Sequence, residues 1–393
     1  MDVDVALLGG GGAGLTVLDA LASARRHGPG PLRVAVIDPV RHRGNDRTWC
    51  FWDDGAGPVD EVVHRHWSTL SVVGPDAVSR PVDLTPRRYV MVRSADYYAR
   101  VARRAERLDV TWLAEPAGAV RDGTRHAEVA TPAGTVRARW VFDSRPRPPT
   151  RPGVTTLLQH FHGWWVTAGR DVFDPDTATL MDFAVPQPDG GLAFCYLLPL
   201  SRCRALVEYT VFSRERHDRP RYERALADHL AARYSLAVGD FRVDETEDGA
   251  IPMTDAPFPR RVGRRVMRIG TAGGATRPAT GYTFTAMLRQ AAGIADRLAA
   301  GAVPVPPRPY PRRHRLFDGV LLRALDTGGI DGPTFFTGLL TGQPIDRVLR
   351  FLDGTSGAVG EFAVLSRAPG GAMTRAAAGY LTRAALRTVR RRP

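Results

Sequence analysis

The chain has 393 residues, of which 44% are hydrophobic and 24% are charged. These values are ordinary for a globular protein and exclude wholesale disorder, and the length allows two or more lobes. All 54 basic residues are arginines, which excludes Schiff-base and P-loop lysine chemistry. The net charge of +13 is compatible with nucleic acid or an anionic membrane as partner. Because no zinc-finger spacing or base-stacking motif is apparent, we favour a membrane surface and expect no nucleic acid.

The three cysteines are too few and too scattered for a disulfide framework, which indicates a reducing compartment. The first apolar stretch reads as a β-strand preceded by acids rather than as a signal peptide. No stretch approaches the roughly twenty apolar residues that span a bilayer. We therefore expect a cytoplasmic protein that is peripherally associated with the membrane, and the oligomeric state stays open.

The first predicted unit is a strand, a glycine-rich turn and a helix, followed by a second strand over residues 34–37. Gly9 allows a tight turn, Gly11 lets a pyrophosphate approach the backbone, and Gly14 lets helix and strand pack closely. The helix dipole favours phosphates at this turn, and an acid after the second strand suits ribose hydroxyls. The residues expected to bind a dinucleotide here are Gly9, Gly11, Gly12, Ala13, Gly14 and Asp38.

The next predicted elements follow from turn and capping signals. Ser94 is the expected N-cap of a helix that runs to about residue 107. A hairpin is expected around residues 133–134, and residues 140–143 read as a buried strand. The Pro- and Arg-rich stretch 145–152 then marks a boundary.

Beyond this boundary the pattern is mainly β, followed by a helix and a second strand–turn–helix unit. Strands are expected over residues 160–166, 179–185, 193–199 and 205–212, a helix over 222–234, a strand over 266–270 and a helix over 281–299. A dinucleotide-binding start, an inserted sheet and a return to strand, turn and helix is the plan of a flavoprotein whose FAD domain is discontinuous. A simple NAD dehydrogenase would continue the Rossmann repeat instead.

The expected fold class is therefore α/β, or α+β overall. It combines a Rossmann-type FAD-binding domain of the hydroxylase-like kind with an inserted β-sheet substrate domain and a helical C-terminal region. The expected divisions are 1–152 for the first part of the FAD-binding domain, 153–250 for the substrate domain, 251–302 for the FAD-binding return segment and 303–393 for the helical region.

Residues 270–284 resemble the G-D-A…P-x-x-G element of FAD-dependent hydroxylases and their relatives. In those proteins the turn contacts the ribityl chain and pyrophosphate, and the next helix points its N-terminus at the flavin ring, favouring negative charge there. The chain departs from the pattern at Thr271, which stands where the hydroxylases usually have Asp. The FAD contacts that the resemblance implies are Gly270, Thr271, Gly273, Pro278, Gly281, Tyr282 and Thr283.

Four segments together resemble the FAD-dependent bacterial lycopene cyclases, the lycopene beta-cyclase family. They are residues 47–52, 180–183, 206–210 and 270–284, in that family's order, and the resemblance spans nearly the whole chain. It implies an intramolecular lyase or isomerase that binds reduced FAD, with NAD(P)H as electron source. The implied reaction converts the ψ-ends of lycopene, or of a related linear carotenoid, to β-ionone rings without net oxidation, giving β-carotene via γ-carotene.

This reaction needs an acid, a base and groups that stabilise a carbocation. The acid protonates C2 of the terminal isoprene unit, the C5–C6 alkene attacks the resulting cation at C1, and the base removes the C6 proton. An electron-rich reduced flavin can stabilise the positive charge in a dry pocket, where charge interactions are strong.

The resemblance assigns the acid to Glu208, at the first Glu position of the family's F-L-E-E-T-like motif. An apolar strand would raise the pKa of this carboxyl and keep it protonated; an outward-facing acid in a salt bridge is the alternative. Tyr209 replaces the second acid of the motif and is assigned to substrate binding. Asp182, on another apolar strand, either shares a proton with Glu208 or forms a structural ion pair with an arginine.

The aromatic segment supplies candidates for the substrate site. The residues expected to line the polyene are Trp49, Phe51 and Trp52, with core packing as the alternative. Arg47 is a candidate FAD contact, although a surface arginine is the default in this chain. His160 and His162 face one side of a strand with no Cys or carboxylate in ligand spacing, so we expect a structural or pocket-lining role and no metal.

A helix over residues 374–392 would have arginines on one side and apolar residues on the other, which suits an interface with anionic lipids. A plain solvated helix is the alternative.

Two rival functions also stay open. A flavin-dependent monooxygenase or prenyl reductase, acting on an isoprenoid or aromatic substrate, would consume oxygen or reductant stoichiometrically. A flavin-binding carotenoid carrier would yield no cyclic product. The sequence does not fix whether one or both ends are cyclised, or which ring forms.

Overall fold

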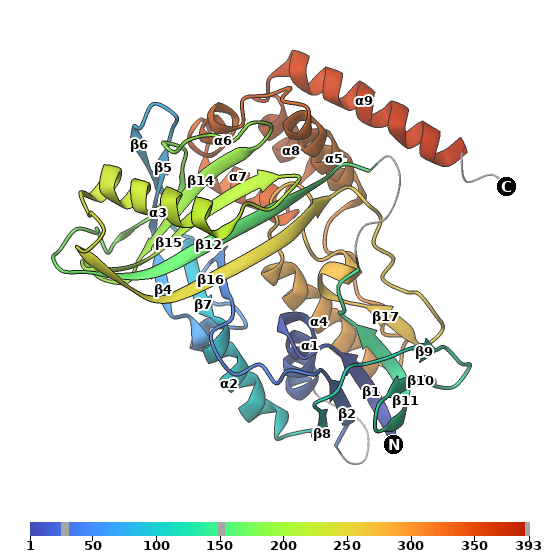
Figure 1. Ribbon diagram of the computed structural model, residues 1–393. Coiled ribbons are helices and arrows are strands. Elements are labelled where there is room, and N and C mark those ends of the chain that lie inside the picture. The colour runs from blue at the N-terminus through green and yellow to red at the C-terminus, as the bar shows by residue number, and fades with distance from the viewer. Residues whose placement is uncertain (25–30, 148–153, 390–393) are drawn as a thin grey trace.

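The computed structural model describes residues 1–24, 31–147 and 154–389, with side chains to residue 383. Figure 1 shows one lobe around the N-terminus, a second lobe built on a large sheet, and C-terminal helices beside that sheet. Of the expected boundary stretch 145–152, residues 148–152 lie outside the described residues.

The first lobe is built on a seven-stranded sheet in the order β8-β2-β1-β11-β10-β9, with β17 pairing β11. Strands β8, β2, β1, β11 and β17 run parallel, and such doubly covered strands read as continuous apolar runs, as β1 does. The strands are β1 (Asp2–Leu8), β2 (Arg33–Ile37), β8 (Asp109–Leu113), β9 (Val120–Arg121), β10 (Ala127–Thr131), β11 (Gly134–Asp143) and β17 (Val266–Arg268). Helices α1 (Gly12–Ser23), α2 (Ser94–Ala105) and α4 (Phe284–Ala299) share one hydrophobic core with it. The expected α/β class with a Rossmann-type sheet is confirmed.

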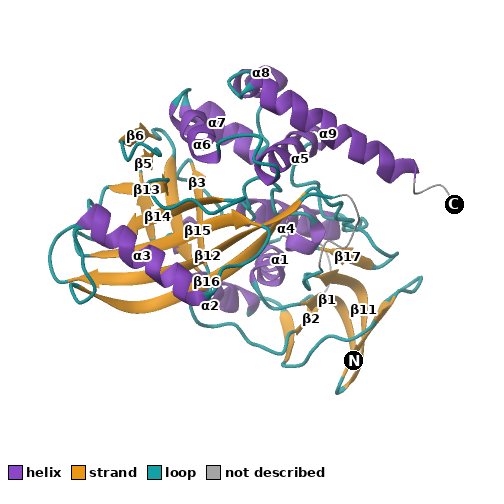
Figure 2. Ribbon diagram, turned by 45° about the horizontal axis from the view of Figure 1, so that its top comes forward, coloured by secondary structure: helices purple, strands orange, loops and turns teal. Residues whose placement is uncertain are grey.

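The second lobe is a seven-stranded sheet in the order β16-β12-β15-β14-β13-β5-β6. All neighbours in it are antiparallel except β13 and β5. Its strands are β5 (Thr69–Val73), β6 (Ser79–Asp83), β12 (Thr156–Ala168), β13 (Thr177–Asp182), β14 (Leu192–Pro199), β15 (Arg204–Ser213) and β16 (Phe241–Thr254). Helix α3 (Arg219–Tyr234), capped by Asp218, covers one face of this sheet (Figure 2).

A small sheet and two 3₁₀ turns complete the region between the lobes. The sheet has the order β3-β7-β4, and its strands are β3 (Thr48–Asp53), β4 (Arg65–Trp67) and β7 (Arg88–Arg93). The 3₁₀ turns are η1 (Asp60–Val62) and η2 (Gly270–Gly273).

The C-terminal region is helical, as expected. Its helices are α5 (Arg312–Asp326), α6 (Gly332–Thr341), α7 (Ile345–Asp353), α8 (Ala358–Leu365) and α9 (Gly370–Val389). Helix α9 begins at Gly370 rather than at residue 374, and residues 390–392 of the expected helix lie outside the described residues. No helix in the described part of the chain is both long enough and apolar enough to cross a bilayer.

The two sheets divide the chain differently from the expected ranges. Strands β5 and β6 lie within residues 1–152 but belong to the second sheet. Strand β16 was not expected at all, because its sequence carries an acidic run at residues 244–248 instead of a clean alternation. The second sheet therefore draws on both sides of the expected boundary at residue 152.

The glycines of the first turn have separate structural roles. Gly9 has a φ of +104°, which favours glycine, and a Cβ at Gly14 would lie 2.0 Å from the Gly9 carbonyl oxygen. Gly11 has a φ of −81°, and a Cβ there would meet nothing within 4 Å. Gly14 is thus required for the fold, whereas Gly11 leaves open space above the turn.

We expect Gly14→Ala to lower the free energy of unfolding by roughly 3 kcal/mol or more, because the helix must move away from the Gly9 carbonyl. Gly11→Ala should change it by less than about 1 kcal/mol. Urea denaturation of both variants measures the difference, and equal stabilities would contradict this account of the turn.

Candidate active site

The first glycine-rich turn forms an open backbone cradle at the start of α1. Gly11 is the N-cap residue and no side chain caps the helix, so the first backbone N–H groups of α1 lack intrahelical partners. The Gly10 N–H donates to Asp38 Oδ2 at 2.7 Å and the Val40 N–H to Oδ1 at 2.8 Å, which holds this carboxylate beside the turn. Free N–H groups suit a phosphate, and the carboxylate suits hydroxyl groups.

The second glycine-rich turn lies directly against the first. A Cβ at Gly270, where φ is +59°, would fall 2.5 Å from the Ala13 Cβ, so only glycine permits this approach. Gly281 also has a positive φ, and a Cβ there would meet Gln159 of β12. The rest of this loop includes Thr271, whose hydroxyl bonds that of Thr276 and through it that of Thr283, together with Gly273, Pro278 and Tyr282. The structure thus brings together the residues expected from both turns.

The contacts of Arg47 are with residues outside the two glycine-rich turns. Its side chain is exposed and donates to the Asp46 carbonyl oxygen. Its charge also opposes the rise that burial causes in the pKa of Glu247, a carboxyl on β16. These contacts place Arg47 near Glu247, and its role as an FAD contact stays a prediction.

Two carboxyl side chains meet in a row that crosses β15, β12 and β16. Gly163 of β12 pairs with Glu208 of β15 on one side and with Glu247 of β16 on the other. Cross-strand partners point to the same face of a sheet, so both carboxyls share a face and the glycine leaves the room between them free. A Cβ at Gly163 would lie 3.6 Å from the Glu208 Cβ and 3.2 Å from the Leu206 Cδ1.

Burial favours the protonated form of one carboxyl in this pair. Desolvation, followed by the charge of Glu247, raises the pKa of Glu208 to about 8, and a 2.8 Å hydrogen bond from the Thr210 hydroxyl opposes the rise. Desolvation also raises the pKa of Glu247, but its carboxylate accepts hydrogen bonds from the hydroxyl and N–H of Thr48. Since the charged form is better stabilised at Glu247, near neutral pH we place the proton on Glu208.

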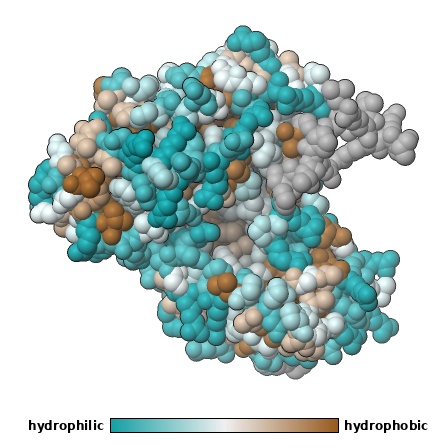
Figure 3. All heavy atoms as spheres, viewed as in Figure 1, coloured by the Kyte–Doolittle hydropathy of each residue, from teal (hydrophilic) through white to brown (hydrophobic). Residues whose placement is uncertain are grey.

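Phenol and thiol groups enclose Glu208. Burial raises the pKa values of Cys50, Tyr89, Tyr196 and Tyr282, and the Glu208 charge adds to the rise at the first three. The hydroxyls of Tyr196 and Tyr282 lie close enough to influence each other's pKa. Four of these groups (Cys50, Tyr196, Glu208 and Tyr282) keep some accessible surface, so they border space that a small molecule can reach. The molecular surface is hollowed between the two lobes (Figure 3).

Strand β3 points its side chains alternately into the two lobes. Trp49 stacks on Phe284 of α4, with ring centroids 4.6 Å apart, and Phe51 packs on the same ring at 5.4 Å. Trp52 points the other way and lies edge-on to Tyr282 at 4.9 Å. Of the three residues expected to line the polyene, Trp52 lies on the side of the carboxyl pair, whereas the other two lie in the core of the first lobe.

Asp182 and Tyr209 lie on the opposite face of the sheet from Glu208. Tyr209 follows Glu208 along β15, so it points to the other side, where it packs against Tyr222 of α3. Asp182 is 1% exposed and its Oδ2 lies 3.1 Å from the Arg233 Nε of the same helix. This geometry favours the ion-pair alternative for Asp182.

His160 and His162 lie on this α3-covered face as well. His160 forms hydrogen bonds with the hydroxyls of Tyr222 and Ser213, and the His162 Nδ1 lies 2.8 Å from the Asp248 carboxylate. Among the described residues, no three His, Cys, Asp or Glu side chains gather closely enough to hold a metal ion. Both histidines are thus satisfied by protein partners.

Glu247 is the candidate that sequence reasoning missed. It lies in an acidic run, residues 244–248, in which the sequence alone does not single out one carboxyl. In the structure Glu247 is 6% exposed, whereas Glu245 is exposed and ion-pairs with Arg93 at 2.9 Å. The available signal was Gly163, a glycine inside a strand of large side chains, which marks a close approach.

The chain is similar in sequence to a known protein. The chain resembles the chloroplastic lycopene beta cyclase of an Oncidium hybrid cultivar, with 26% identity over 317 residues. That match covers 75% of this chain and spans 64% of the orchid protein's length, just under two thirds.

Solved structures share the fold at low sequence identity. A flavoprotein/dehydrogenase from Cytophaga hutchinsonii superposes with a TM-score of 0.62 at 12% identity, covering 97% of this chain and 100% of that one. A geranylgeranyl bacteriochlorophyll reductase-like protein from Thermoplasma acidophilum gives 0.57 at 13% identity, covering 95% and 98%. The family model described as "Lycopene cyclase protein" matches residues 4–378. The chain therefore belongs to the lycopene cyclase family.

Proposed function

We propose that this protein is a lycopene cyclase that closes the ψ-ends of lycopene, or of a related linear carotenoid, into β-ionone rings, giving β-carotene via γ-carotene. The observation that carries this proposal is the pair of half-buried Glu208 and buried Glu247 beside the two glycine-rich turns. Hydrocarbon cyclisation by proton addition needs an acid that stays protonated at neutral pH, and desolvation supplies one here.

The pair can donate one proton and accept one back, which suits an isomerisation. Protonated Glu208 donates to C2 of the terminal isoprene unit, and the C5–C6 alkene then attacks the cation at C1. The proton lost from C6 returns to the pair, so atoms and electrons balance without net oxidation. The charge on Glu247, held by Thr48, faces the positive substrate and lowers the energy of the cation in a site of low dielectric.

The residues of both turns fit a flavin dinucleotide. The uncapped start of α1 and the open space over Gly11 would receive the pyrophosphate, and Asp38 the ribose. The loop from Gly270 to Thr283 would contact the ribityl chain and direct the start of α4 at the ring. When bound and reduced, with NAD(P)H as electron source, FAD would supply electron density that stabilises nearby positive charge.

Access to a water-insoluble substrate requires contact with lipid, and the C-terminal helices suit this role. Val359 and Phe362 of α8 are 85% and 74% exposed, and Leu365 continues their row at helical spacing. Helix α9, expected to be a basic amphipathic helix, lies beside them, although its side chains beyond residue 383 are outside the described residues. We propose peripheral membrane association through this region.

Expression in a lycopene-accumulating host tests the function directly. Chromatography of the pigments should show conversion of lycopene to monocyclic and bicyclic products. Glu208→Gln should lower conversion by about 100-fold or more while leaving flavin bound, because the amide cannot donate the proton. Glu245→Gln, at an exposed carboxyl of the same strand that ion-pairs with Arg93, is the matched control. Unchanged red pigment with wild type, or oxygen consumption matched to product, would favour one of the rival flavoprotein functions.

The pH profile should report the carboxyl pair. Because the acid form of Glu208 is the reactive one, kcat/KM should be level near neutrality and fall above a pKa of about 8. Glu247→Gln removes a negative neighbour, so the pKa of Glu208 should drop and the alkaline limb should move to lower pH. A limb that stays in place, or moves to higher pH, would contradict this coupling.

Gly11→Val should raise the dissociation constant for FAD by about tenfold or more, because the side chain occupies the space over the turn. Flavin absorbance of the purified protein and titration of the apoprotein measure the effect. Gly357→Val is the matched control: Gly357 is also an N-cap residue at φ −81° with open space around it, but at α8. Equal flavin content in the two variants would remove Gly11 from the cofactor site.

A further inference from the structure

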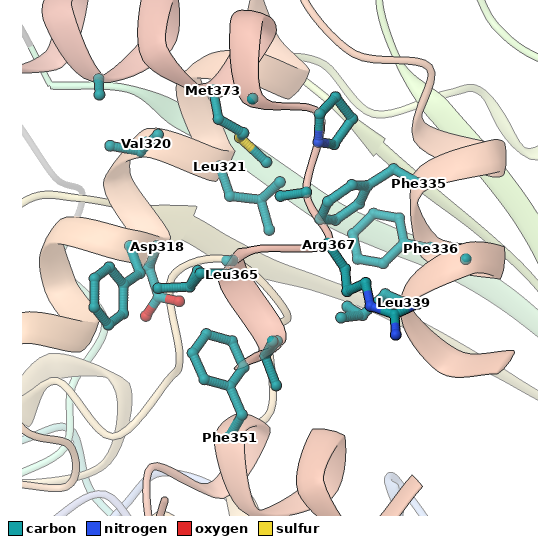
Figure 4. Close-up of a pocket in the computed structure, with 18 of the residues that line it drawn as sticks. Asp318, Val320, Leu321, Phe335, Phe336, Leu339, Phe351, Leu365, Arg367 and Met373 are labelled. Atoms are coloured by element: carbon teal, nitrogen blue, oxygen red, sulfur yellow. The ribbon is translucent and has the colours of Figure 1, made fainter. Parts of the chain in front are cut away.

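A large apolar cavity lies between the C-terminal helices, away from the carboxyl pair. Its volume is about 830 Å³, and side chains of α5, α6 and α9 with the segments around α7 and α8 form its wall. Figure 4 shows Leu321, Phe335, Leu339 and Met373 pointing into this space. A cavity of this size and lining suits a hydrocarbon rather than a polar ligand.

The charges at the inner end of the cavity neutralise each other. Arg277, 1% exposed, lies 3.1 Å from the Asp318 carboxylate and also donates to the carbonyl oxygens of Phe351 and Leu352. The guanidinium is thus satisfied by protein groups. The cavity offers a ligand mainly apolar surface, although Asp318 Oδ2 and the Thr280 hydroxyl in its wall have no hydrogen-bond partner among the described residues.

One side chain of the cavity wall also packs against the sheet that carries the carboxyl pair. Phe336 lines it and also contacts Phe212 of β15, with centroids 6.3 Å apart. Phe212 lies on the same face of β15 as Glu208, four residues away, because alternate residues share a face. Thr280, in the loop that leads to Tyr282, is also part of the cavity wall.

The outer rim of the cavity is apolar and exposed. Leu316, Leu365 and Leu381 line the cavity and are 40%, 37% and 56% exposed. Leu365 ends the exposed row of α8 that begins at Val359. A hydrocarbon that leaves a lipid surface at this row would meet the cavity without crossing water.

We propose that this cavity receives the unreacted half of the linear polyene while the other end is cyclised at the Glu208–Glu247 pair. The proposal rests on the proposed cyclase function and adds a binding site for the substrate tail. It explains why an apolar space of this size lies one side chain away from the acid-bearing sheet, with its exposed rim on the face offered to lipid.

Gly338 of α6 gives the sharpest test, because it lines the cavity and a Cβ there would meet nothing within 4 Å. Gly338→Phe should narrow the cavity with no clash at its Cβ, and Gly338→Ala controls for the change in helix propensity. The full-length chain with FAD is assayed with lycopene and with a shortened acyclic polyene that keeps one reactive end. The expected result is a KM for lycopene raised about tenfold, equivalent to losing roughly two buried methylene groups, with the short substrate unaffected.

The outcomes separate this proposal from the function on which it rests. If wild type cyclises neither substrate, the proposed function fails, and the cavity proposal with it. If wild type is active but Gly338→Phe treats lycopene normally, or impairs both substrates equally, the cavity does not hold the tail. Should Gly338→Phe not fold, as judged by flavin content and melting temperature, Thr334→Trp on the same helix blocks the rim and is read in the same way.

Discussion

The candidate chemistry depends on two carboxyls that flank one glycine. Gly163 leaves a gap in the row that joins Glu208 to Glu247, so both acids enter a space where neither is well solvated. Two carboxylates in such surroundings do not both ionise readily, and the hydrogen bonds decide which one keeps the proton. Thr48 donates twice to Glu247, whereas among the described residues Glu208 accepts one hydrogen bond, from the Thr210 hydroxyl. The asymmetry that an acid catalyst needs therefore comes from strand β3, outside the sheet that carries the acids.

Strand β3 also sets the position of this pair relative to the glycine-rich turns. Its alternation sends Thr48, Cys50 and Trp52 toward the second sheet and sends Trp49 and Phe51 into the first lobe. Trp49 stacks on Phe284, the first residue of α4, and its indole lies close to the backbone of Gly12. One short strand thus connects the acid pair to both helix N-termini that would hold the cofactor.

The features that were predictable from sequence have a local signature. The turn from Gly9 to Gly14 combines a spacing with a following acid, and Glu208 stands out as a lone carboxyl in an apolar strand. Glu247 has no such signature, because several acids adjoin it and only the register with β12 selects which one points inward. The placement of Asp182 under α3 likewise depends on which face of the sheet the helix covers, and strand alternation alone does not fix this. The cavity depends on packing among five helices, and no single segment of the sequence predicts it.

The loop between the second glycine-rich turn and α4 links the cavity to the candidate active site. Arg277 anchors the loop to the middle of α5 through Asp318 and to the end of α7 through the carbonyls of Phe351 and Leu352, in full burial. Removing one partner from such a buried charge pair costs about 3–5 kcal/mol, because the other charge is left buried and unpaired. Thr280 lies in the cavity wall, and two residues later Tyr282 contacts Trp52 and Tyr196 beside the acids. A hydrocarbon held in the cavity would therefore contact the same short segment that borders the candidate acid site.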